Sequence, residues 1–217
     1  METIQENYVK SEPKWLAWVQ QIQALAQDGL AYTHNPFDRE RFQRLQELAA
    51  QIMAEYSGSE FERVNGLFTQ EAGYATPKLD CRGVVFHDGK LLLVKERADG
   101  GCTLPGGCVD VGEPPSRAVE REVLEESGYR VKACRLLALD DRSAPRHGHP
   151  PYIFHAYKLF MLCDLLGGGP ASSIETDGAG FFAEDEMPPL STMRVTTEQI
   201  QRMFEHYRNP HLPVEFD

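Results

Sequence analysis

The chain has 217 residues, of which 41% are hydrophobic and 25% charged, the balance of an ordinary globular protein. No apolar run approaches the roughly 18 residues that a membrane span needs. The N-terminus shows neither the basic nor the apolar part of a secretion signal, so we expect a soluble, cytoplasmic protein. A net charge of -11 disfavours tight, non-specific binding to nucleic acid or an anionic membrane. The five cysteines form no C-x-x-C pair, which argues against a disulfide framework and a zinc site.

Residues 13–68 carry a helical pattern throughout. Gly29 is expected to end a first helix, the turn at Asn35-Pro36 to precede a second, and a capping box of Ser59 and Glu62 to begin a third. Apolar stripes run along the first two helices: Trp15, Trp18, Val19, Ile22, Leu25 and Ala26, then Phe42, Leu45, Ala49, Ile52, Met53 and Tyr56. No catalytic group stands out here, so we expect this region to serve packing and dimerisation, with substrate shaping as the alternative.

Beyond residue 75 the pattern changes to that of strands. We therefore predict a helical domain over residues 1–74 and a second domain over residues 75–217. Two apolar runs flank Asp88-Gly89, a strong hairpin signal. Strands are predicted at 84–86, 91–94, 131–139, 152–163 and 180–182, and a last helix at 196–207, with Thr196 and Gln199 as its capping box. Strands mixed with well-separated helices indicate a sheet sandwiched between helices.

The segment around residues 115–128 is predicted to be a helix with three glutamates on one face. Pro115 suits its first position and Gly128 its C-terminal cap, while Glu122, Glu125 and Glu126 are spaced i, i+3, i+4. Like charges at this spacing are mildly destabilising unless a cation lies between them. Carboxylate oxygens favour Mg²⁺, Mn²⁺ or Ca²⁺, and such metals suit diphosphate chemistry. Taken alone, the three glutamates also fit a solvated acidic face.

The longer stretch from Gly107 to Tyr129 decides between these interpretations. It is similar to the Nudix signature G-x5-E-x7-R-E-U-x-E-E-x-G-U at Gly107, Glu113, Arg121, Glu122, Val123, Glu125, Glu126, Gly128 and Tyr129. Tyr129 departs mildly, because an aliphatic residue is usual there. The resemblance identifies the chain as a member of the Nudix hydrolases. It implies an α+β fold, the Nudix α/β/α sandwich with a mixed sheet, preceded here by a small helical N-terminal domain.

The same resemblance implies roles for individual residues. Glu122, Glu125 and Glu126 would be catalytic ligands of Mg²⁺ or Mn²⁺, with Glu122 and Glu126 foremost. Arg121 would orient the site by pairing with Glu113. The carbonyl of Gly106, the glycine before the motif, would be a further metal ligand.

The helical N-terminal region followed by residues 73–78 and 82–86 resembles a bacterial Nudix subgroup that hydrolyses nucleoside diphosphates linked to a second group X. That resemblance implies a homodimer that cleaves a small-molecule substrate of the ADP-ribose, CDP-choline or UDP-sugar class to NMP and X-phosphate. Two alternatives remain: a Nudix-fold regulator that senses a ligand, and an RNA-directed exonuclease or decapping enzyme. The intact motif counts against the first and the acidic charge balance against the second.

Four residues outside the motif are further candidates. Glu175 is the candidate general base, because several relatives keep a glutamate in this loop; the alternative is a solvated carboxylate. Arg82 and Lys95 are candidates for contact with substrate phosphates, or else exposed strand charges. Arg146 lies in a loop rich in groups that bind phosphate or stack on a base.

Overall fold

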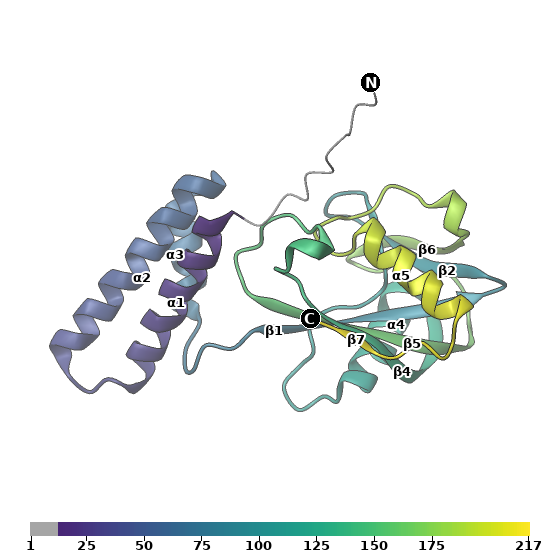
Figure 1. Ribbon diagram of the computed structural model, residues 1–217, viewed down its shortest axis with the longest axis horizontal. Helices are drawn as coiled ribbons and strands as arrows, with labels where there is room; N and C mark the ends of the chain where they lie inside the picture. Colours follow the sequence, from purple (N-terminus) through teal and green to yellow (C-terminus); the bar gives the residue numbers. More distant parts are fainter. Residues whose placement is uncertain (1–12) are drawn as a thin grey trace, which may run out of the picture. The chain divides into compact units, whose positions relative to one another are not determined.

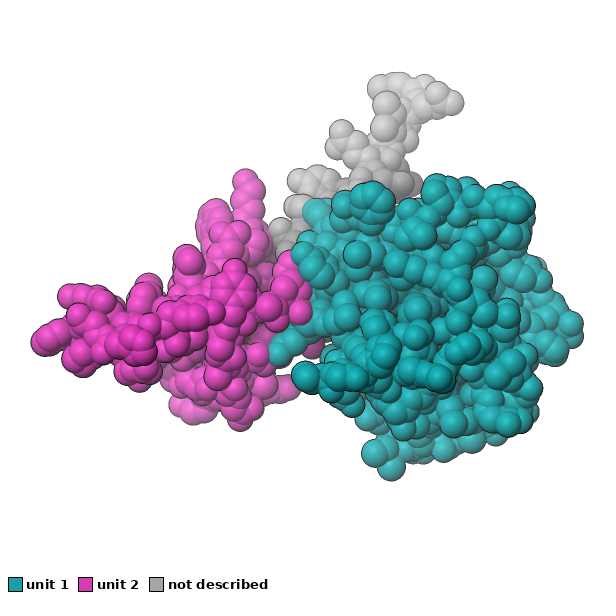
Figure 2. Space-filling view, turned by 90° about the horizontal axis from the view of Figure 1, so that it is seen from below, with its two compact units in different colours: residues 1–11, 78–150, 156–217 teal, residues 12–77, 151–155 magenta. Residues whose placement is uncertain are grey.

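The computed structural model describes residues 13–217 and divides into two compact units, coloured separately in Figure 2. The first is the helical region up to Pro77 together with Pro151–His155. The second holds Lys78–Pro150 and Ala156–Asp217. None of the described helices combines the length and apolarity needed to cross a membrane.

The helical unit contains α1 (Lys14–Tyr32), α2 (Pro36–Ser57) and α3 (Phe61–Gln70) (Figure 1). Asn35 caps α2 by accepting a hydrogen bond from the amide of Phe37, as the predicted turn requires. Buried apolar side chains from all three helices form one core: Leu16, Val19, Ala49, Ala50, Met53, Val64 and Phe68.

Two predicted helix boundaries in this unit are wrong. α1 does not end at Gly29 but continues to Tyr32. A Cβ on Gly29 would lie 2.4 Å from the ring of Phe42, so the glycine permits close packing against α2. Ser59 and Glu62 do not form a capping box, because α3 begins after Glu60 and has no side-chain cap.

Part of the predicted apolar stripes remains exposed within the chain. Trp18 and Leu25 on α1 are 60% and 67% exposed, and Tyr56 on α2 is 64% exposed. The sequence placed these residues on apolar stripes without deciding what covers them, and the core of the unit uses Leu16 and Val19. The helical unit therefore presents large apolar side chains that its own core does not cover.

The second unit is built on a seven-stranded mixed sheet in the order β3-β2-β1-β5-β4-β7, with β6 paired to β2. Its strands are β1 (Lys78–His87), β2 (Lys90–Glu96), β3 (Cys102–Thr103), β4 (Tyr129–Asp141), β5 (Ala156–Gly168), β6 (Thr176–Phe182) and β7 (Glu215–Phe216). β1 pairs parallel with β5 and antiparallel with β2. Two 3₁₀ turns, η1 (Pro145–His147) and η2 (Glu184–Glu186), lie in the connections.

Two helices cover opposite faces of this sheet (Figure 1). α4 (Pro115–Ser127) buries Val119 and Val123 on the face that carries Val85 of β1. α5 (Thr197–Arg208) buries its apolar residues on the other face, against Val84 of β1. The predicted α/β/α arrangement is confirmed, and so is the capping box that begins α5.

Each predicted strand is present, but several boundaries differ: β1 and β6 begin earlier than predicted, and β5 both begins and ends later. The hairpin between β1 and β2 turns at Asp88 and Gly89, which both have positive φ, as a type I′ turn requires. The strand predicted from residue 152 begins only at Ala156. Residues before it belong to the helical unit, where the carbonyl of Tyr152 accepts a hydrogen bond from Gln20. The two-residue strands β3 and β7 had no sequence signal.

Candidate active site

Helix α4 places the three motif glutamates in different degrees of exposure. Pro115 occupies its first turn, and Gly128 ends it at φ 77° with its amide bonded to the carbonyl of Leu124. Glu126 is 6% exposed, the side chain of Glu122 15% and that of Glu125 57%. Only Glu122 and Glu126 are therefore held in a largely desolvated position.

A tight glycine turn lies against these two carboxylates. The amide of Gly106 donates a 2.8 Å hydrogen bond to Oε2 of Glu126. Gly106 has φ 145°, and a Cβ on it would lie 2.0 Å from the carbonyl oxygen of Cys81. A Cβ on Gly107 would lie 3.0 Å from Oε1 of Glu122. The missing side chain at Gly106 lets the turn pack against β1, and the missing side chain at Gly107 lets it approach Glu122.

Arg121 ties the loop before the helix to the glutamates. Its guanidinium donates two hydrogen bonds to Glu113, at 3.1 and 2.9 Å, as the sequence predicted. It also donates to Glu122 at 2.9 Å and to Glu125 at 3.1 Å. These partners raise the pKa of Arg121, so the side chain stays charged and orients Glu122.

Burial disfavours the ionised forms of Glu122 and Glu126 when no cation is near. Burial raises the pKa of Glu126 to about 7, and repulsion from Glu122 and Glu96 adds to this. Burial also raises the pKa of Glu122, against the opposing effect of Arg121. A nearby cation would lower the pKa of both groups, because it favours the charged carboxylates.

Two further segments meet α4 at Glu126. Thr176, at the start of β6, donates a 2.7 Å hydrogen bond from Oγ1 to the carbonyl of Glu126, which brings the loop of Glu175 to the end of α4. Glu96, at the end of β2, pairs in register with Thr176, is buried, and bonds to Nε of Arg194 at 2.8 Å. Burial raises the pKa of Glu96. Glu96 and Arg194 lie outside the motif, and no sequence pattern marks them as site residues.

Two family models match this chain: NUDIX domain over residues 77–203, and an N-terminal oligomerisation domain described as UDP-X-like over residues 13–68. The first covers more than half of the sequence and includes every residue of the glutamate motif. The chain belongs to the Nudix family.

Two of the relatives match the Nudix protein over nearly its whole length, and a third matches over about two thirds of it. "Putative ADP-ribose pyrophosphatase YjhB" of Bacillus subtilis (strain 168) is 43% identical over 209 residues, which are 96% of this chain and 100% of the relative. The crystal structure of a UDP-X diphosphatase aligns with a TM-score of 0.61 and 32% identity, over 94% of this chain and 98% of that one. An ADP-ribose pyrophosphatase from Streptococcus suis 89-1591 aligns with a TM-score of 0.59 and 41% identity, over 65% of this chain and all of that one. The chain is a Nudix hydrolase.

Nudix hydrolases generally use divalent metals, and the residues around Glu126 fit such an ion. The donors are carboxylate oxygens of Glu122 and Glu126, the chemistry that hard cations prefer. Within the described residues no hydrogen bond ends on the carbonyl of Gly106, whereas the neighbouring carbonyls of Pro105 and Gly107 accept bonds from β1. The Gly106 oxygen is thus available as a further donor.

The sheet places Arg82 and Lys95, both predicted to contact substrate phosphates, in different surroundings. Arg82 is not an exposed strand charge: it is 6% exposed and ion-paired with Asp80. Lys95 is exposed, but its cross-strand partner Cys102 belongs to the core beneath α5, so Lys95 is on the face opposite α4. The structure does not bring Lys95 to the α4 carboxylates.

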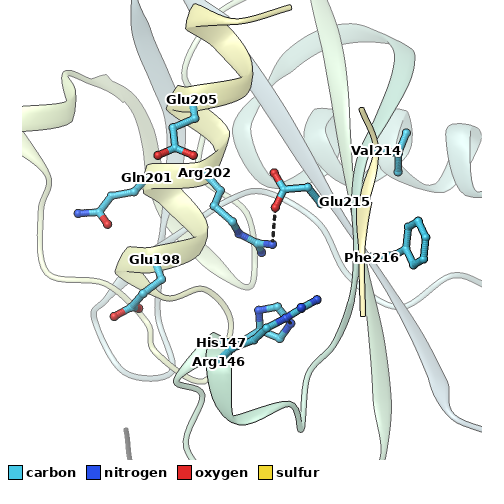
Figure 3. Close-up of a pocket in the computed structure, with 9 residues that line it drawn as sticks. All are labelled: Arg146, His147, Glu198, Gln201, Arg202, Glu205, Val214, Glu215 and Phe216. Atoms are coloured by element: carbon cyan, nitrogen blue, oxygen red, sulfur yellow. Dashed lines mark hydrogen bonds and ion pairs between the residues drawn. The ribbon is translucent and has the colours of Figure 1, made fainter. Parts of the chain in front are cut away.

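Arg146 belongs to a different group of residues. It lies beside a pocket of about 540 Å³ between η1, α5 and β7 (Figure 3). Its guanidinium forms an ion pair with Asp217, which also bonds to the buried His147. Arg146 is therefore engaged with the chain's own carboxylate and is not among the groups around Glu126.

Proposed function

We propose that this Nudix hydrolase cleaves nucleoside diphosphate-X compounds of the ADP-ribose, CDP-choline or UDP-sugar class to NMP and X-phosphate, with Mg²⁺ or Mn²⁺. The observation that carries the proposal is the pair of desolvated carboxylates, Glu122 and Glu126, held against the Gly106–Gly107 turn. Relatives over nearly the whole chain are named for ADP-ribose and UDP-X, which supports the substrate class.

In this proposal Glu122, Glu126 and the Gly106 carbonyl hold the metal, with Glu125 as a peripheral ligand. When bound, the divalent cation supplies charge neutralisation at the phosphate oxygens and a more acidic water. Arg121 keeps Glu122 oriented through its two partners on the loop and the helix. Attack of water on one phosphorus of the diphosphate breaks the P–O bond to the bridging oxygen, and a protein base accepts the proton.

We assign the role of base to Glu175, because its loop is anchored to Glu126 through Thr176. The Glu175 side chain is exposed, so glutamine at this position leaves the fold unchanged. Glu175→Gln is expected to lower kcat by about 100-fold, the usual contribution of a positioned base, with unchanged Mn²⁺ binding. Steady-state kinetics and electron paramagnetic resonance of Mn²⁺ test this. Wild-type kcat in the variant would remove Glu175 from the mechanism.

The substrate class is tested by product release over a panel. ADP-ribose, CDP-choline and UDP-sugars are incubated with Mg²⁺ or Mn²⁺, and alkaline phosphatase converts the monophosphate products to inorganic phosphate. Nucleoside triphosphates form a separate arm read through inorganic pyrophosphatase, because alkaline phosphatase attacks them directly. We expect strong turnover of one diphosphate class. EDTA should abolish it when the products are separated by chromatography, a readout needed because EDTA also inactivates alkaline phosphatase. Silence across the panel with metal present would contradict the proposal.

We further propose that the helical unit forms a homodimer through its exposed apolar residues. Trp18 and Leu25 share one face of α1, and the matching family model describes this region as an oligomerisation domain. Trp18→Glu is expected to convert the dimer to a monomer in light scattering, while Arg63→Glu on the exposed surface of α3 leaves it dimeric. A dimer that survives Trp18→Glu would place the interface elsewhere.

A further inference from the structure

Arg82 belongs to a buried ionic cluster next to the glycine turn. Its Nη2 bonds to Oδ1 of Asp80 at 2.9 Å and its Nε to Oδ2 at 3.1 Å. Lys158, also buried and paired with Asp80 across β1 and β5, forms a second ion pair with the same carboxylate. The guanidinium is therefore clamped from one side in a bidentate geometry that lysine cannot reproduce.

The other side of the guanidinium reaches the turn itself. Nη1 of Arg82 donates a 3.2 Å hydrogen bond to the carbonyl of Leu104. The next residues are fixed to β1 by backbone bonds of 2.8 Å each, from Gly83 to Pro105 and from Cys81 to Gly107. Gly106, between these anchors, donates to Glu126.

We propose that Arg82 is a positioning residue for the metal site: it fixes the Leu104 carbonyl so that Gly106 meets Glu126 in one geometry. The inference rests on the proposed metal-dependent hydrolysis. A buried ion pair contributes little net stability, because desolvation offsets its attraction. The planar guanidinium of Arg82 does fix the position of the Leu104 carbonyl. The same stretch of backbone contacts the buried carboxylate of Glu126 through Gly106. Side chains that orient a metal's ligands commonly matter almost as much as the ligands themselves.

This role differs in a measurable way from the phosphate contact that the sequence suggested for Arg82. Three of its N–H groups are bonded within the chain, to Asp80 and Leu104. A substrate contact would raise KM when removed. A positioning role would weaken metal binding and lower kcat, with KM for the substrate unchanged, because no substrate bond is lost.

The test is Arg82→Lys, which keeps the charge beside Asp80 and removes the fork. We expect the dissociation constant of Mn²⁺, measured by electron paramagnetic resonance without substrate, to rise about 10-fold, with a similar fall in kcat. Higher KM with wild-type Mn²⁺ binding would replace positioning by substrate contact. Unchanged Mn²⁺ binding and unchanged kcat would show that Arg82 does not position the metal site.

A matched variant separates positioning from general destabilisation. Arg202→Lys alters a partly buried arginine of α5, which pairs with Asp140 of β4 on the opposite face of the sheet. It is expected to lower the melting temperature while leaving Mn²⁺ binding unchanged; an equal loss of Mn²⁺ affinity would overturn the inference. If Arg82→Lys does not fold, Asp80→Glu keeps the negative charge beside Arg82 and Lys158 but changes the geometry of the clamp, and it should weaken Mn²⁺ binding in the same direction. A wild-type protein that binds Mn²⁺ but hydrolyses no diphosphate would refute the proposed function and leave the binding comparison valid.

Discussion

Glu126→Gln will lower metal-dependent turnover by at least about 100-fold and leave the fold intact. Glutamine can still accept the hydrogen bond from Gly106, but it cannot offer a charged oxygen to a cation. Because burial raises the pKa of Glu126 from its ordinary 4.5 to about 7 in the folded protein, stability is lost as the pH rises from about 4.5 to 7, and the full cost is present at pH 8. At pH 8 without metal the variant should therefore melt at the same temperature as the wild type or higher. Steady-state kinetics at saturating Mg²⁺ and a thermal melt monitored by circular dichroism measure both effects.

Glu205→Gln provides the control for this experiment. Glu205 is exposed on α5, so the same chemical change there should alter neither turnover nor melting temperature. Addition of Mn²⁺ should raise the melting temperature of wild type and of Glu205→Gln, but much less that of Glu126→Gln. Near-normal turnover in Glu126→Gln would refute the assignment of Glu126 as a metal ligand.

The features that the sequence predicted correctly depend on short-range signals. Asp88-Gly89 specifies a two-residue hairpin whatever surrounds it, and the capping box of Thr196 and Gln199 begins α5 through bonds between residues three apart. The spacing of Glu122 and Glu126 puts them on one face of any helix. Local geometry of this kind can be inferred from a few consecutive residues.

The features that were missed depend on pairing between distant segments. Glu96 reaches the site because β2 pairs with β6, where Thr176 bonds to the end of α4. In the sequence Arg82 resembles an exposed strand charge. In the fold it belongs to a buried cluster, because β5 places Lys158 beside its partner Asp80. No local pattern gives the order of strands in a sheet, so neither position could be assigned in advance.

The helical unit shows a different limit. Helical periodicity placed Trp18 and Leu25 on an apolar stripe, and the folded unit leaves both exposed. A hydrophobic pattern shows that a face avoids water, but it cannot show whether the chain itself or a second copy covers that face. The prediction that Gly29 ends α1 was wrong for a related reason, because this glycine allows contact with Phe42 of another helix.

Gly106→Ala is expected to cost about 3 kcal/mol or more of unfolding free energy and to abolish tight Mn²⁺ binding. At φ 145° the backbone is in a region that side chains rarely occupy, and the new Cβ would lie 2.0 Å from the carbonyl oxygen of Cys81. The turn must therefore move away from β1, which also breaks the hydrogen bond to Glu126. Urea unfolding gives the free energy, and electron paramagnetic resonance of Mn²⁺ gives the affinity.

Gly89→Ala separates backbone strain from the loss of close approach. Gly89 also has positive φ, 75°, but nothing lies within 4 Å of a Cβ built there. Its replacement should cost about 1 kcal/mol, the ordinary penalty of a left-handed residue, and leave Mn²⁺ affinity unchanged. If Gly106→Ala lost no more stability than Gly89→Ala and still bound Mn²⁺ tightly, the contact of the turn with β1 would not be what holds the Gly106 amide against Glu126.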